Sequence, residues 1–428
     1  MKSFALVTLL LSGLVLGTSG RLLADTRVGT DNRPRWLTEL STASRVGYDS
    51  NLYAVDNSRP GVPLADRGAW NGSFGFKVAV SVSALADAPK DALQLGYAPT
   101  FTWFEGASGE NYTQHRFTLL SAGRRDAWSW SFDNTATYIH GPDDSPRFNT
   151  YNIFGMGFVR DRRSQLQDAG KGWLRYDGAG YFVRGTLAAQ VCDYRTELRA
   201  PTAAEAGRLN WVDRNDLNGG FDLGWKVSPA TSLFVGGRWG RQQQATTPWM
   251  PKSSSNRYTR ALLGLEGRPA KWLSCSLVGG PDFRRYAAAT QCMTDRTPVT
   301  WHYAANATAT LGAADSLAFT AKQERWLSST GQSAYDGKSL SLTWQHGFNE
   351  VWGLSLGAQL QQGKYPSPIV RNDVLYAGQA QLRWRASRQW VATLDATLQD
   401  AGDLLDLPAA AGRGFRRTVV GFGIQYSP

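Results

Sequence analysis

Strict alternation of apolar and polar residues dominates this chain. In SLTWQHGFNEVWGLSLGAQLQ (residues 341–361), almost every second position is apolar, and mostly Thr, Gln, Ser and Gly stand between them. Only Asn349-Glu350 separates the two halves, which predicts a β-hairpin with one apolar and one polar face. In a soluble sandwich the apolar face points into the core. In a membrane barrel it contacts lipid, and the polar face lines the lumen.

Similar segments recur along the chain, and their length favours the barrel. Each is about ten to fourteen residues long, whereas globular strands average about five or six residues and lipid-crossing strands need about nine to eleven. The fold class we predict is an all-β, transmembrane, antiparallel up-and-down β-barrel of about 18 strands, with 16 as the alternative. The predicted strands begin near residues 37, 70, 92, 112, 127, 150, 173, 215, 232, 257, 272, 298, 316, 338, 351, 373, 390 and 415.

Short and long connections alternate between these segments, as in outer-membrane barrels with short periplasmic turns and longer extracellular loops. Short turns are expected at 228–231, 269–271, 312–315, 349–350 and 387–389. Longer loops are expected at 50–69, 140–149, 196–214, 246–256, 287–297, 329–337 and 401–413. The stretch 160–172 fits this scheme least well, because it is too long for its place.

Aromatic residues stand beside the short turns, where an amphipathic ring suits a membrane surface. The predicted periplasmic aromatic belt consists of Trp128, Trp225, Trp272, Trp352, Trp384, Trp390 and Tyr426. Rings beside turns could instead cap the core of a soluble sandwich. The clustering at one end of the segments favours the belt.

The N-terminus has the features of a secretory signal peptide. Lys2 precedes an apolar run from Phe4 to Leu16, and small residues follow. We therefore expect a signal peptide over 1–24, a short periplasmic segment over 25–36 and a single barrel domain over 37–428. The expected location is the outer membrane of a Gram-negative bacterium.

Pleat parity predicts which charged residues face the lumen. They are Lys77, Asp133, Asp222, Lys226, Arg238, Glu266, Arg268, Lys322, Glu324, Arg383, Arg385 and Asp395. Charges of both signs suit a water-filled pore, although these side chains could equally pair with one another. The net charge is +11, and removal of residues 1–24 with Lys2 and Arg21 leaves +9. A basic surface favours anionic solutes or the phosphates of lipopolysaccharide.

Signs of catalysis, metal binding or nucleic-acid binding are weak. Three cysteines and four histidines match no metal-site spacing, and we expect no cofactor, no metal and no enzymatic activity. His140 with Asp143 and Asp144 suits an ordinary polar loop better than a hydrolase site. Asp49-Ser50-Asn51 begins like a calcium loop, but an Asx turn accounts for it more simply. No nucleic-acid motif is present.

Cys275 and Cys292 flank a predicted outer loop, and the spacing leaves open whether they pair or stay as free thiols. Nothing in the residues around them indicates a redox role.

The element Gly-Tyr-Asp-Ser-Asn, within RVGYDSNLYAVD (residues 45–56), resembles the β-barrel porin 2 family of outer-membrane porins. Its members share a signal peptide, a similar length and an aromatic-rich barrel, and some are encoded with exopolysaccharide biosynthesis genes. The C-terminus resembles the signal read by the barrel-assembly machinery, although Ser427-Pro428 follow the expected terminal aromatic Tyr426.

These patterns lead to a functional hypothesis with one alternative. The hypothesis is a porin-like barrel that lets small hydrophilic solutes diffuse passively. The alternative, implied by the resemblance, is a barrel for exopolysaccharide export or its scaffolding. The expected partners are outer-membrane lipid and lipopolysaccharide, the assembly machinery through the C-terminal strand, and a solute or polysaccharide. A homo-oligomer is compatible with this architecture.

Overall fold

The described part of the chain forms one closed β-sheet in a computed structural model. It comprises residues 34–54, 68–83, 91–141, 163–195, 211–246, 251–287, 295–329, 333–367, 369–405 and 414–428. The predicted signal peptide over 1–24 lies outside these ranges. No helix within them has the length and apolar character needed to cross a membrane.

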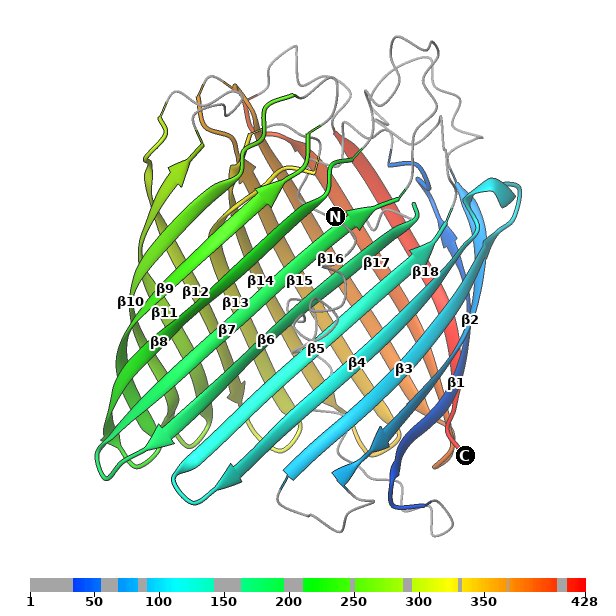
Figure 1. Cartoon of the computed structure of the whole chain (residues 1–428). Helices are drawn as coiled ribbons and strands as arrows, with labels where there is room; N and C mark the ends of the chain where they lie inside the picture. The colour runs from blue at the N-terminus through cyan, green and yellow to red at the C-terminus, as the bar shows by residue number, and fades with distance from the viewer. Residues whose placement is uncertain are drawn as a thin grey trace.

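Eighteen long antiparallel strands make up the sheet, and they are steeply tilted (Figure 1). The strands are β1 (Leu37–Asp49), β2 (Ala69–Ser81), β3 (Asp91–Phe104), β4 (Tyr112–Arg125), β5 (Trp128–His140), β6 (Gln165–Asp177), β7 (Tyr181–Tyr194), β8 (Arg214–Ser228), β9 (Thr231–Gln244), β10 (Asn256–Ala270), β11 (Leu273–Tyr286), β12 (Val299–Thr310), β13 (Asp315–Trp326), β14 (Tyr335–Gly347), β15 (Trp352–Lys364), β16 (Asn372–Arg385), β17 (Trp390–Asp403) and β18 (Phe415–Tyr426). A short 3-10 helix, η3 (Ser108–Glu110), lies between β3 and β4. Each strand pairs with its sequence neighbours, and β18 pairs with β1, which confirms the predicted barrel class.

The closing pair of strands is held by a side-chain contact as well as by the backbone. Arg45 on β1 donates to both carboxylate oxygens of Asp395 on β17, at 3.1 Å and 2.7 Å, and so reaches over β18. Gly421 on β18 makes this possible, because a Cβ there would lie 2.1 Å from the Arg45 guanidinium. The seam between the first and last strands therefore carries a partly buried ion pair above a glycine.

The two faces of the sheet have opposite polarity. Large apolar side chains on the outer face are exposed, for example Trp301 at 67% and Leu263 at 65%. Charged side chains at alternate positions are buried, for example Asp222 at 0% and Asp282 at 1%. A soluble domain has the reverse distribution, whereas a barrel in lipid has this one.

The two ends of the barrel differ in their connections, and we call them the short-turn end and the long-loop end. Turns such as 126–127, 229–230 and 271–272 close one end, and the C-terminus lies at the same end (Figure 1). The predicted turn at Asn349 is ordered by its own side chain, whose oxygen accepts the backbone N–H groups of Val351 and Trp352, both at 2.8 Å. One connection at the short-turn end, residues 82–90 between β2 and β3, contains more residues than the others.

The sixth and seventh strands were predicted too early in the chain. The strand expected near 150 lies outside the described residues, and β6 begins instead at Gln165. The start expected near 173 falls inside β6, and β7 begins at Tyr181. The stretch 160–172, which fitted the predicted scheme least well, contains the true boundary.

The motif that carries the family resemblance forms a turn at the long-loop end. Asp49 accepts the backbone N–H of Asn51 at 3.0 Å, which is an Asx turn. The same carboxylate binds Arg417 on β18, and the hydroxyl of Ser50 accepts the backbone N–H of Thr418 at 2.8 Å. Among the described residues no group of three or more His, Cys, Asp or Glu side chains is placed to hold a metal.

Candidate functional site

The barrel interior is the candidate site, and contacts between distant strands identify its inner face. Arg175 on β6 donates to Glu266 on β10 at 2.6 Å, although β7, β8 and β9 lie between them. Arg184 on β7 donates to the other oxygen of Glu266 at 2.7 Å. Side chains on strands so far apart can meet only across the concave side of the sheet. Positions in phase with these residues therefore face the interior.

The charged residues predicted to face the lumen lie on strands all around the barrel. Several contact each other: Lys322 pairs with Glu324, and Asp222 accepts from Arg238 at 2.7 Å. Others pair with residues that the sequence did not single out. These pairs are Lys77 with Glu39, Lys226 with Asp177, Asp395 with Arg45 and Glu266 with both Arg175 and Arg184. Arg383 and Arg385 stand together near the short-turn end of β16, Arg268 is exposed at the same end of β10, and Asp133 lies within β5.

The predicted belt residues lie at the short-turn end on the outer face. Trp352 and Trp384 stack at 5.9 Å between ring centroids, and Trp390 lies 4.7 Å from Tyr426. Trp128 packs edge-on against Tyr176 at 5.2 Å. The tryptophans of the predicted set are exposed, namely Trp128, Trp225, Trp272, Trp352, Trp384 and Trp390.

One group of charges, the β6–β10 cluster, fills the interior near the short-turn end. It consists of Arg175, Asp177, Arg184, Asp222, Arg238 and Glu266. Asp222 is fully buried and accepts from Arg184 at 2.8 Å and from Arg238 at 2.7 Å and 3.0 Å. Phe182 is also fully buried, and the Arg175 guanidinium lies 3.7 Å from its ring centroid. Each buried charge thus has an opposite charge or an aromatic face against it, as burial requires.

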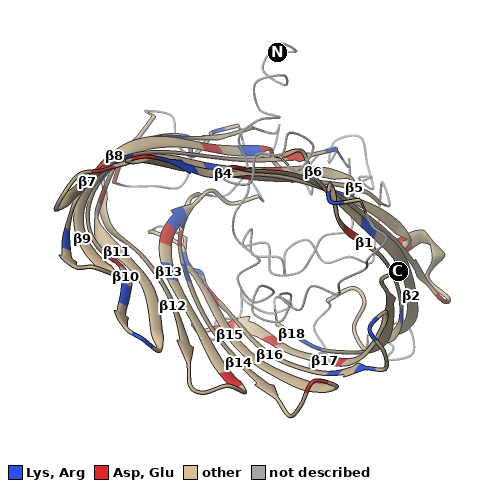
Figure 2. Ribbon diagram, turned by 90° about the horizontal axis from the view of Figure 1, so that it is seen from below, with Lys and Arg blue, Asp and Glu red and all other residues tan. Residues whose placement is uncertain are grey.

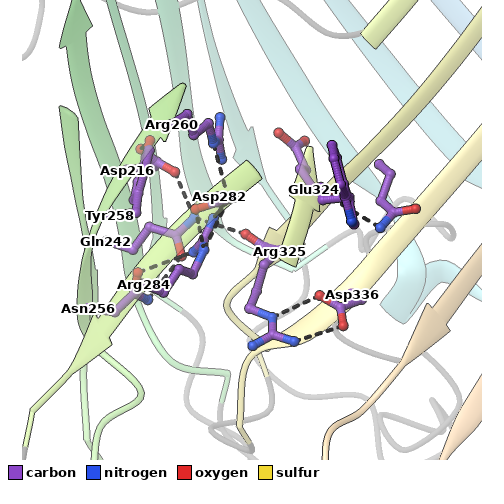
Figure 3. A network of polar contacts seen from close by, with 12 residues as sticks. Asp216, Gln242, Asn256, Tyr258, Arg260, Asp282, Arg284, Glu324, Arg325 and Asp336 are labelled. Atoms are coloured by element: carbon purple, nitrogen blue, oxygen red, sulfur yellow. Dashed lines mark hydrogen bonds and ion pairs between the residues drawn. The ribbon is translucent and has the colours of Figure 1, made fainter. Parts of the chain in front are cut away.

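A second group, the β9–β11 cluster, fills the interior nearer the long-loop end (Figure 3). Arg284 donates to Asp282 at 2.8 Å and to the carboxamide oxygen of Gln242 at 2.6 Å. Gln242 in turn donates to Asp216 at 2.7 Å, and Asp216 accepts the hydroxyl of Tyr258 at 2.7 Å. These side chains connect β8, β9, β10 and β11 in one polar layer.

The long-loop end of β13 bends into the barrel and packs on this layer. Pairing between β12 and β13 stops at Tyr303 and Gln323, so the last residues of β13 separate from β12 while they stay paired with β14 as far as Trp326. Gln242 then donates to the carbonyl of Arg325 at 3.1 Å, Arg214 to that of Leu327 at 2.6 Å and Gln244 to that of Ser328 at 2.7 Å. Seen along the barrel, β13 lies further inward than β12 (Figure 2). We call residues 324–329 the inward segment.

A hydrophobic contact crosses the barrel at the long-loop end. Trp211, just before β8, packs in a buried cluster with residues from the opposite wall, and Tyr194 contacts its ring edge-on at 4.9 Å. The other members are Ala54, Leu375, Ala401 and Phe415. The next residue, Val212, donates its N–H to the carbonyl of Ser329 in the inward segment at 2.8 Å. Burial raises the pKa of the neighbouring Asp213 above its usual value. The backbone N–H of Tyr194, which donates to Asp213, acts in the opposite direction but has the smaller effect.

The inner face of β15–β17 is different, because amides and hydroxyls line it. Gln379 and Gln381 alternate with outward Tyr376 and Trp384, so they point inward, yet both are exposed. Inward side chains that are exposed must border open space. The other polar residues on this wall are Ser355, Gln359, Gln361, Thr393, Thr397 and Gln399.

Two alternatives from the sequence concern groups at the barrel ends. His140 ends β5 and is exposed, whereas Asp143 and Asp144 lie outside the described residues. Cys275 is a free thiol near the short-turn end of β11, and Cys192 is also free. Cys292 lies outside the described residues, and Cys275 stands almost a full strand away from the loop that was expected to join them.

Sequence reasoning missed several residues that build this interior. Arg175, Asp177 and Arg184 were missed because β6 and β7 were misplaced. Trp211 stands in a connection, where no strand pattern points to it. Phe182 had one local signal: it faces Gly224 on β8, where a Cβ would lie 2.1 Å from its ring. A glycine opposite an aromatic residue on a neighbouring strand indicates a ring lying flat on the sheet.

Comparison with known proteins leaves the family open. No protein family model matches the chain, and no curated protein matches its sequence. The family resemblance of residues 46–53 therefore stays a prediction. Among solved structures the chain is similar to OccK2 (OpdF) of Pseudomonas aeruginosa, with a TM-score of 0.43, 10% identity, and coverage of 91% of this chain and 97% of that one.

It is also similar to the siderophore receptor PirA of Acinetobacter baumannii, with a TM-score of 0.42, 9% identity, and coverage of 92% of this chain and 81% of that one. Likeness this distant assigns no function. The class of protein, a closed β-barrel of eighteen strands, rests on the strand pairing itself.

Proposed function

We propose that the protein is a porin-like barrel of a Gram-negative outer membrane that lets small hydrophilic solutes diffuse passively. The observation that carries this proposal is the polar inner wall of β15–β17, where inward Gln379 and Gln381 are exposed, inside a barrel with an apolar outer face. Amide and hydroxyl groups can donate and accept hydrogen bonds. They replace the bonds that a hydrated solute loses on entry without holding it tightly.

The solute path in this proposal is eccentric. The β6–β10 cluster, the β9–β11 cluster and the inward segment occupy the side formed by β6–β13. Solutes would therefore pass along β15–β17, with the Trp211 contact narrowing the long-loop end. Export of a polysaccharide is less well supported, because a polymer chain would have to separate the Trp211 contact that crosses the long-loop end.

Planar-bilayer recording on refolded protein tests the proposal directly. We expect stepwise insertion events, each followed by a steady ohmic current in KCl. A refolded barrel that inserts into the bilayer but carries no ionic current would overturn the proposal. Insertion is checked independently by protease protection in vesicles.

Arg383 and Arg385 should set part of the ion selectivity. Both are cations on the polar wall, and Arg383 lies over Gly353, whose absent side chain leaves room for it. Changing both to serine should lower the anion-to-cation permeability ratio by a factor on the order of two to ten. The reversal potential in a KCl gradient measures this ratio. Arg416→Ser is the control, since Arg416 is 80% exposed on the outer face. An unchanged ratio in the double variant would contradict the assigned path.

A further inference from the structure

Three arginines form a continuous row on the outer face at the long-loop end. Arg257 on β10 stands directly opposite Arg241 on β9 and Arg285 on β11. All three are exposed. Their sequence neighbours Gln242, Asn256 and Arg284 contact one another in the interior and are buried. Alternation along each strand therefore points the three guanidinium groups away from the barrel.

This row (the arginine row) lacks the compensation found elsewhere at the same end. Within the described parts of the chain none of its members forms an ion pair. By contrast, outward Arg416 on β18 faces Asp400 on β17 and pairs with it at 3.2 Å. Like charges directly opposite each other in a sheet are destabilising. A row of three such charges is therefore held in place against its own repulsion, which an anionic ligand would relieve.

Further into the barrel wall from the arginine row, the outward residues change from aromatic to aliphatic. Thr259, one outward position further into the barrel wall, stands opposite Trp239 and Phe283. Both rings are exposed, at 49% and 47%, and Leu263 beyond them is 65% exposed. Cation, aromatic ring and aliphatic side chain in this order match the change from headgroup to acyl chain at a membrane surface.

We propose that the arginine row binds phosphate groups carried by lipids of the outer leaflet. A guanidinium is planar and always charged, and it donates bidentate hydrogen bonds to phosphate. Neighbouring strands are about 4.8 Å apart, so adjacent arginines can converge on one phosphate or bridge two. The lipid's acyl chains would lie on Trp239, Phe283 and Leu263. The proposal rests on the proposed function only for its membrane orientation, with the long loops outward.

The test uses the full chain, refolded in neutral detergent, with diphosphorylated lipid A as probe and native mass spectrometry as readout. The variant changes Arg241, Arg257 and Arg285 together to glutamine. We expect its apparent affinity to fall by roughly tenfold or more, because it loses charge-assisted, bidentate bonds. The corresponding lysine variant keeps the charge but loses the fork geometry, and its affinity should fall between the two.

Matched controls make the outcome decisive. Arg416→Gln removes an outward arginine that is already paired, and should bind lipid A as the original chain does. Dephosphorylated lipid A should bind no better to the original chain than to the triple variant. Excess inorganic phosphate should not displace the lipid, which separates a lipid site from a simple anion site.

Equal affinity of the triple glutamine variant and the original chain for diphosphorylated lipid A would overturn the proposal. Bilayer conductance of the same preparations is measured in parallel. If the barrel conducts and lipid A binds equally well with and without the arginine row, only the lipid site is refuted. A barrel that binds lipid without conducting refutes the proposed channel alone.

Discussion

Replacement of Asp222 by alanine is expected to destabilise the barrel by about 3–5 kcal/mol, the range for breaking a buried ion pair from one side. Asp222 is fully buried and is bonded by Arg184 and Arg238. Its loss leaves two largely buried guanidinium groups, each 15% exposed, with too little negative charge, since Glu266 is shared with Arg175. Asp222→Asn keeps the shape and removes the charge, so its cost should be comparable.

Urea unfolding of the refolded protein in vesicles, followed by tryptophan fluorescence, measures this change. Asp400→Ala is the matched control, because it breaks the outward pair with Arg416, in which the side chains are 57% and 80% exposed. An exposed pair of this kind is worth about 0–1 kcal/mol. Similar losses in the Asp222 and Asp400 variants would show that the β6–β10 cluster is solvated rather than buried.

Most of the barrel could be predicted from the sequence because the alternation within each strand shows which of its faces is apolar. Outward residues must be apolar along the whole lipid-facing stretch, so a segment such as β15, with Trp352, Leu354 and Leu356 on one face, predicts its own length and pleat phase. The turn at Asn349 marks where that phase restarts. These signals are local and need no knowledge of the partner strand.

Local signals fail at β6 because its outer face is unusual. The positions in phase with exposed Leu174 include Asp168, Gly170 and Gly172, so the expected apolar alternation is missing. The stretch 150–159 alternates better and so predicts a strand in its place. Pairing of β6 with β5 and β7 along its whole length outweighs its weak pattern, and no single segment reveals such pairing.

The contents of the interior could be predicted only as a set of inward charges. Parity places Asp222, Arg238 and Glu266 on the inner face, but it does not say which of them meet. Arg175 and Glu266 are 91 positions apart, and their contact depends on the curvature of five strands. The position of the inward segment could be predicted even less well. Its strand pattern and its pairing with β14 continue through Glu324 and Trp326, while hydrogen bonds from β8 and β9 hold it away from β12.

Loosening the inward segment should open the channel further. Arg214 and Gln244 donate to the carbonyls of Leu327 and Ser328. Each buried hydrogen bond is worth about 0.5–1.5 kcal/mol, and a buried carbonyl left without a donor costs more. Changing both residues to alanine should therefore raise the population of released segment by roughly tenfold or more. Single-channel records should show excursions to a higher conductance level.

Gln379→Ala provides the control, because Gln379 also points inward but lies on β16, away from β13. It removes one inward amide without touching the inward segment and should leave the frequency of excursions unchanged. If the double variant only loses stability and conducts as before, the inward segment is a fixed support for the wall. If the excursions appear, the hydrogen bonds that fill the β6–β13 side also limit the width of the path beside it. The polar filling of the barrel would then control conductance as well as stability.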